Sequence, residues 1–87
     1  MITKKLLHDI ITFCNNYIDN KNVLFAINKY TTFIGADINV WSLDNNGMID
    51  NQIGTITSYV RDINDFKDFK QKVLEKLPKL LEQLKEK

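Results

Sequence analysis

Apolar residues recur at three- and four-residue intervals through the first part of the chain, while polar residues fill the positions between them. That spacing places the apolar side chains on one face of a helix. Thr3 is a suitable N-cap, and the cluster Asn20-Lys21-Asn22 is a suitable stop. The pattern therefore predicts an amphipathic helix with the following apolar stripe: Leu6, Leu7, Ile10, Ile11, Cys14, Tyr17 and Ile18.

Three segments with the patterns of β-strands follow. Val23–Ile27 is short and apolar, and Phe33–Leu43 alternates between apolar and mostly polar residues. The third strand is expected within Met48–Arg61, most clearly over Ile53–Val60. Between the second and third segments, Asp44-Asn45-Asn46-Gly47 predicts a hairpin, because glycine tolerates the positive φ that a tight turn demands.

The last segment returns to helical spacing. Asp62, Asn64 and Asp65 supply caps and negative charge at its start, where the helix dipole favours them. The apolar stripe that follows comprises Phe66, Phe69, Val73, Leu77, Leu80 and Leu84. Pro78 interrupts this stripe, and a proline inside a helix costs ~3 kcal/mol because it removes a hydrogen bond and clashes with the preceding turn. We therefore expect a kink near residue 75, or two helices that meet at Leu77-Pro78.

The order of elements predicts one α+β domain over residues 1–87, built as a helix, a three-stranded antiparallel sheet and a second helix. Both helices are expected on one face of the sheet. The chain has 87 residues, of which 44% are hydrophobic, enough for one modest core and for one domain only.

Composition points to a cytoplasmic protein. Cys14 is the single cysteine, so no disulfide can form within the chain. No signal peptide is evident, and no stretch approaches the ~20 apolar residues that a membrane span needs. All basic residues except Arg61 are lysine, and Asn and Ile are abundant. These residue types are favoured by A+T-rich codons, which suggests a low-GC bacterium or one of its phages as the source.

The sequence contains no constellation of residues that would support catalysis, a metal or a cofactor. His8 and Cys14 are unique, and on a helix they fall on nearly opposite faces. The tract from Ser42 to Ile53 resembles part of a calcium-binding EF-hand loop, but Ser42 and Ile53 stand where that motif needs Asp and Glu. We expect a hairpin there, and a protein that is not an enzyme and has no cofactor.

The sheet face away from the helices is the first candidate binding surface. If Ala36, Ile38 and Val40 point inward, their neighbours along the strand point outward, although a one-residue slip would invert the assignment and place Trp41 in the core. Trp, Tyr and Arg are the residue types enriched at binding hot spots. The predicted protein-binding residues are Asp37, Asn39, Trp41, Leu43, Tyr59 and Arg61, with Thr55 and Thr57 beside them.

The second candidate surface lies on the last helix. Leu74, Leu77, Leu81 and Leu84 follow a three-four-three spacing, which is typical of two heptads of a helix–helix seam. Packing against the protein's own sheet is the default for such a stripe. The alternative is a homodimer through this helix, which would make the chain a small homo-oligomeric structural protein.

Two resemblances bear on function. The element order resembles that of double-stranded-RNA-binding domains, which implies a nucleic-acid-binding alternative, but those domains open their second helix with basic residues. This chain has the acidic run Asn64-Asp65-Phe66-Lys67-Asp68 there, and its net charge is only +1. Size and composition resemble those of small phage or mobile-element proteins, anti-CRISPR inhibitors among them. We therefore expect a protein-binding module that binds a bacterial host protein and modulates or inhibits it.

Overall fold

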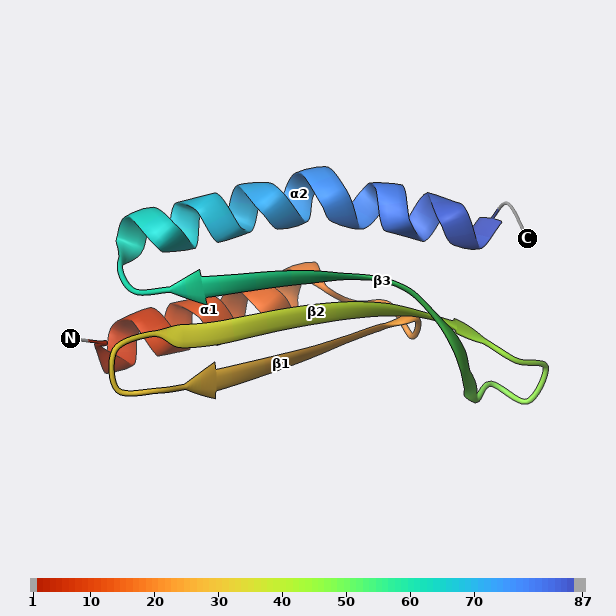
Figure 1. Ribbon diagram of the computed structural model, residues 1–87, viewed down its shortest axis with the longest axis horizontal. Coiled ribbons are helices and arrows are strands. Elements are labelled where there is room, and N and C mark those ends of the chain that lie inside the picture. The colour runs from red at the N-terminus through yellow and green to blue at the C-terminus, as the bar shows by residue number, and fades with distance from the viewer. Residues whose placement is uncertain (1, 86–87) are drawn as a thin grey trace.

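The computed structural model describes residues 2–85 as two helices and one three-stranded antiparallel sheet (Figure 1). The elements in chain order are α1 (Lys4–Tyr17), β1 (Val23–Lys29), β2 (Ile34–Leu43), β3 (Ile49–Val60) and α2 (Ile63–Lys85). The predicted α+β architecture is therefore confirmed. Each predicted strand is present, and β1 and β3 extend beyond their predicted cores.

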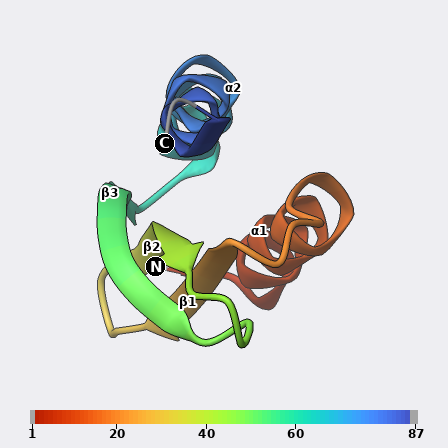
Figure 2. The ribbon, with the colours of Figure 1, turned by 90° about the vertical axis from the view of Figure 1, so that its right-hand side faces the viewer.

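The sheet has the order β1-β2-β3, so β2 lies in the middle and β1 and β3 form its edges. Phe25, Ile38 and Ile56 are opposite one another across the three strands. Figure 2 shows both helices against the same, concave face of the sheet. In the part of the chain that the structure describes, no element covers the opposite face.

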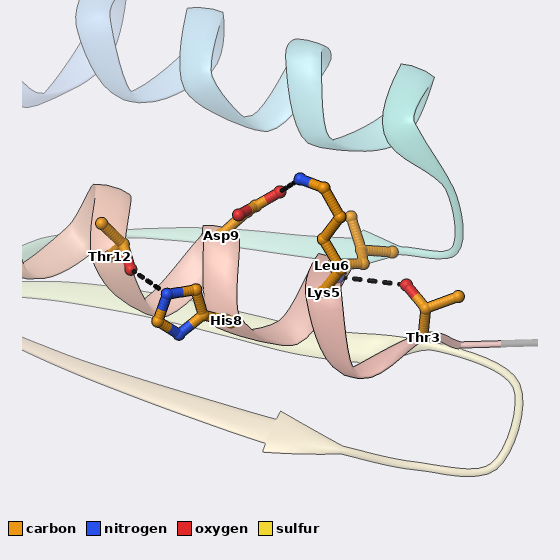
Figure 3. A network of polar contacts seen from close by, with 6 residues as sticks. All are labelled: Thr3, Lys5, Leu6, His8, Asp9 and Thr12. Carbon is orange, nitrogen blue, oxygen red and sulfur yellow. Dashed lines mark hydrogen bonds and ion pairs between the residues drawn. The ribbon is translucent and has the colours of Figure 1, made fainter.

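Helix α1 begins where the sequence predicts, at the N-cap Thr3. The Leu6 N–H donates to Thr3 Oγ1 at 3.1 Å, as expected of an N-cap, and Lys5 Nζ lies 2.8 Å from Asp9 Oδ2 one turn on (Figure 3). The helix ends at Tyr17, three residues before the predicted stop at Asn20.

The buried face of α1 is narrower than the predicted stripe. Leu6, Ile10 and Cys14 are buried, but Ile11 and Tyr17 are 37% and 39% exposed, so their assignment to the stripe is wrong. Phe13, which lies outside the predicted stripe, packs edge-on against Phe66 and Phe69 of α2 at centroid distances of 6.2 and 5.9 Å. This aromatic contact joins the two helices directly.

The β2–β3 hairpin forms where it was predicted. Asp44 Oδ1 accepts hydrogen bonds from the N–H groups of Asn46 and Met48, both at 2.9 Å, and the Gly47 N–H donates to the Asp44 carbonyl. Gly47 has φ +80°, the left-handed conformation that glycine adopts at little cost. These bonds use the Asp44 carboxylate for turn formation.

α2 runs unbroken from Ile63 to Lys85 with Pro78 inside it, so the expected division into two helices at Leu77-Pro78 is wrong. Asp62 caps its start, since the Asp65 N–H donates to Asp62 Oδ1 at 2.9 Å. Pro78 lies on the exposed side of the helix, where water can reach the Leu74 carbonyl that lacks an N–H partner.

The core lies between the helices and the sheet. Ile10 and Phe69 from the helices and Ile38 from the middle of the sheet are each at most 1% exposed. At Gly54, an added Cβ atom would lie 2.6 Å from Leu80 Cδ2, so the absence of a side chain there lets α2 approach β3. The register of β3 shifts on either side of Trp41, and beyond these shifts the hairpin projects past the sheet (Figure 1).

Candidate protein-binding surface on the sheet

The structure decides which side of β2 faces the helices. Ala36, Ile38 and Val40 are completely buried, and Asp37 and Asn39 between them point to the opposite side. The predicted register is thus the observed one. We call this opposite side the outer sheet face; its residues are Leu24, Ala26, Asn28, Tyr30, Phe33, Gly35, Asp37, Asn39, Trp41, Gln52, Thr55, Thr57 and Tyr59.

Polar side chains on the outer sheet face bond across the strands. Thr57 Oγ1 donates to Asp37 Oδ1 at 2.8 Å, and Gln52 Nε2 donates to Asn39 Oδ1 at 3.0 Å. Such cross-strand pairs fix the positions of side chains that would otherwise rotate freely. The middle of the face therefore presents donors and acceptors in a defined arrangement.

An aromatic cluster closes one end of this face, where β1 turns into β2. Tyr30 stacks on Phe33 with ring centroids 4.7 Å apart, and Phe33 meets Tyr59 edge-on at 5.6 Å. The rings lie over Gly35, which is buried although it belongs to the outer sheet face. We call Tyr30, Phe33 and Tyr59 the aromatic cluster. The sequence analysis identified Tyr59 but missed Tyr30 and Phe33, which lie in the turn between β1 and β2. The feature of the sequence that could have identified them is their closeness to Gly35, a residue without a side chain over which rings can pack.

Arg61 adds a positive charge beside the aromatic cluster. Its side chain is 72% exposed, and its Nε lies 3.3 Å from Asp65 Oδ2. The Arg61 backbone N–H also donates to that carboxylate, and this bond is the main reason why the pKa of Asp65 is lowered. Together with Thr32, Phe33 and Tyr59, Arg61 lines an open depression in the surface.

The other predicted site residues lie farther along the sheet. Trp41 is half-buried and pairs with Gln52 between the two register shifts. Leu43 pairs with Ile49 beyond both shifts and lines a crevice with Leu84 of α2. The structure therefore brings Tyr59 and Arg61 together at one end, places Asp37 and Asn39 in the middle, and leaves Leu43 at the far end.

The four leucines of the predicted seam on α2 do not form one exposed row. Leu77 is 4% exposed and belongs to the core, and Leu81 and Leu84 pack against that core. Leu74 alone of the four is exposed, at 51%. Most of this stripe is therefore used for packing within the domain.

Groups with chemical reactivity are few in the described part of the chain. Burial raises the pKa of the Cys14 thiol to about 11, which keeps it protonated and poorly nucleophilic. Exposed His8 lies 3.5 Å from the Thr12 hydroxyl, one turn away on α1 (Figure 3). Within residues 2–85, no group of three or more His, Cys, Asp or Glu side chains is arranged to hold a metal ion.

A hollow between the starts of the two helices is lined by Leu6 and Ile63 together with polar residues. Those polar groups already have partners, since Lys5 pairs with Asp9 and Asp62 caps α2.

Neither helix, over the residues described, is long and apolar enough to cross a membrane.

No family model, curated protein or solved structure matches this chain.

Proposed function

We propose that this protein is a binding module whose outer sheet face docks against another protein. The observation that carries the proposal is a sheet face that no other element of the described chain covers, on which large side chains remain exposed. Tyr59 is 66% exposed, Tyr30 is 52% exposed and Leu24 is 49% exposed. Exposed aromatic residues are enriched at protein interfaces.

The chemistry of the face suits recognition of a protein surface. The aromatic cluster offers apolar contact area with little side-chain entropy to lose, because the rings already hold one another in place. Arg61 can donate to a carboxylate or carbonyl of the partner. The bonded pairs at Asp37 and Asn39 supply directional polar contacts that reward one docking register over another.

The partner we propose is a bacterial host protein that this protein modulates or inhibits by occupying a surface, as small phage or mobile-element proteins do. The composition of the sequence supports this choice of partner, and the binding surface supports the mode of action. With a net charge of +1, recognition depends on shape and hydrogen bonding more than on long-range attraction.

The test is capture of partners by the tagged 87-residue chain from a low-GC bacterial lysate, with nuclease present and at low and high salt. We expect one stoichiometric protein that survives both treatments, and at least about a tenfold loss of its affinity in the Tyr30→Ala, Tyr59→Ala double variant. Leu74→Ala is the matched control, because it removes a side chain of similar exposure from α2. Circular dichroism confirms that all variants fold.

Other outcomes would assign the alternatives. Recovery of nucleic acid alone, lost at high salt, would replace the proposal with double-stranded nucleic-acid binding. A partner, or a homodimer seen by light scattering, that is lost in Leu74→Ala and kept in the double variant would place the interface on α2.

A further inference from the structure

We propose a second binding site, which adjoins the outer sheet face at Thr57 and Tyr59: the free edge of β3 and the facing side of α2 accept an extended peptide as a fourth strand. The groove between them, here the β3–α2 groove, includes Thr57, Ser58 and Tyr59 of the strand and Asp65, Asp68 and Lys72 of the helix.

The backbone groups at this edge follow from the pairing of the other strands. The Tyr30 N–H donates to the Phe33 carbonyl, and the Trp41 N–H donates to the Asn22 carbonyl at 2.7 Å. Odd-numbered residues of β2 therefore bond to β1, and even-numbered ones bond to β3. Because Ala36 is opposite Ser58, the even-numbered residues of β3 bond to β2 in the regular part of the ladder. Thr57 and Tyr59 consequently direct their N–H and C=O groups away from β2, toward the free edge.

Two side chains of α2 agree with this direction, because each bonds to a backbone group of the free edge. Lys72 Nζ donates to the Thr57 carbonyl at 3.2 Å, and Asp65 Oδ2 accepts the Arg61 N–H at 2.9 Å. Between these two contacts lie the N–H and C=O of Tyr59, which an incoming strand can pair with. Lys72 occupies the acceptor that the N–H of such a strand needs, so it competes with the peptide.

The groove also contains a polar group that has no partner. Ser58 is 8% exposed and faces α2, and its Oγ is buried with no hydrogen-bond partner among the described residues. A buried hydroxyl in this condition is unusual in a folded protein. A polar side chain or backbone group of a bound peptide would satisfy it.

The two cations that line the groove, Arg61 and Lys72, already bond to Asp65 and to the Thr57 carbonyl. Asp68 lines the groove and, in the part of the chain described, forms neither an ion pair nor a side-chain hydrogen bond, whereas Asp65 already pairs with Arg61. A lysine or arginine on the α2-facing side of the peptide would pair with Asp68. The partner is therefore an extended segment of another protein with a basic residue on the side that faces α2.

The experiment titrates the 87-residue chain with a peptide of alternating valine and lysine, and with its counterpart of alternating valine and glutamate. Amide hydrogen exchange measured by NMR locates the bound peptide. We expect exchange of the Tyr59 amide to slow at least about tenfold with the lysine peptide, since pairing removes that amide from water. Lys72→Ala should tighten binding severalfold, and Asp68→Asn should weaken it by a similar factor.

Several results would overturn this inference: no binding of the lysine peptide, protection at the β1 edge instead, equal binding of the glutamate peptide, or weaker binding in Lys72→Ala. The two proposals fail independently. Tyr30→Ala alters the outer sheet face and should leave the peptide affinity unchanged, whereas Asp68→Asn should leave capture of the protein partner unchanged.

Discussion

Cys14 lies on the buried face of α1 with no exposed surface, and the consequence is a thiol that resists ionisation. Burial raises its pKa from 9.0 to about 11, so the unfolded chain loses this proton at lower pH than the folded one. The stabilisation is therefore fully present below about pH 9 and is lost as the pH rises to about 11. We expect the urea midpoint of the wild type to fall over this range.

The matched control for this prediction is Cys14→Ala, which is less stable but lacks the thiol. Tyrosine and lysine residues also ionise at high pH, so the Cys14 contribution is the difference between the two pH profiles. Parallel profiles would show that the thiol ionises equally in both states. In the same buffer below pH 9, a thiol reagent should label the wild type slowly until denaturant is added.

The structural role of a single residue could be predicted when the residues that it contacts are close to it in the sequence. The cap at Thr3 and the turn at Gly47 were predicted because each depends on neighbours within a few positions. Phe13 was missed as a residue that packs against the core, because the rings that it contacts lie in α2, far along the chain. Tyr30 and Phe33 stack on each other locally, but they were omitted from the predicted site because the residue that joins them to it, Tyr59, lies on β3, far along the chain.

At the level of elements, Pro78 is the clearest conflict between sequence and structure. α2 continues through it, so the helix lacks one N–H donor and the Leu74 carbonyl lacks its partner. Because Pro78 is exposed, Pro78→Ala should restore that bond without creating a cavity. We expect a gain of about 1 to 3 kcal/mol in the free energy of unfolding, measured by urea denaturation.

Lys79→Ala is the control for this substitution, because it changes an exposed neighbour that leaves the backbone bonding intact. Its effect should stay within about 0.5 kcal/mol. An unchanged or lower stability in Pro78→Ala would mean that the Leu74 carbonyl is fully satisfied by water, or that the proline restricts the unfolded chain enough to offset its cost.

Periodicity predicted all five elements but defined their buried faces less well. The stripe on α1 included Ile11 and Tyr17, which are exposed because the sheet covers only part of an apolar helix face. In the strands the inward positions were predicted correctly, since alternation with a period of two leaves only one alternative register.

For the whole molecule, the distance between the helix layer and the sheet depends on Gly54. A Cβ atom added there would lie 2.6 Å from Leu80 Cδ2, closer than packed atoms approach. Gly54→Ala should therefore destabilise the fold by about 1 to 3 kcal/mol, because Leu80 is already packed against the core and must move.

A double-mutant cycle with Leu80→Ala tests the cause. If the clash is responsible, the second substitution removes it, and the two changes should be coupled by about 0.5 to 3 kcal/mol. Additive effects would instead assign the cost of Gly54→Ala to the backbone of β3 near its register shift.

The binding surfaces belong to the whole molecule and were only partly predictable. The residues of the outer sheet face could be predicted from the alternation along β2. Which backbone groups of β3 point to its free edge depends instead on how β1 and β2 pair at their turn, and no residue pattern encodes that pairing. Likewise, the contact between Lys72 and Thr57 joins elements whose relative position is a product of the fold.

Trp41 is the single tryptophan of the chain, and it lies half-buried on the outer sheet face, on the same strand as Asp37 and Asn39. Ultraviolet emission from the folded protein, when excited at the red edge of aromatic absorption, thus originates from one known position. The molecule contains its own optical probe at the surface where a partner is proposed to dock, and no dye or added label is needed to follow the encounter.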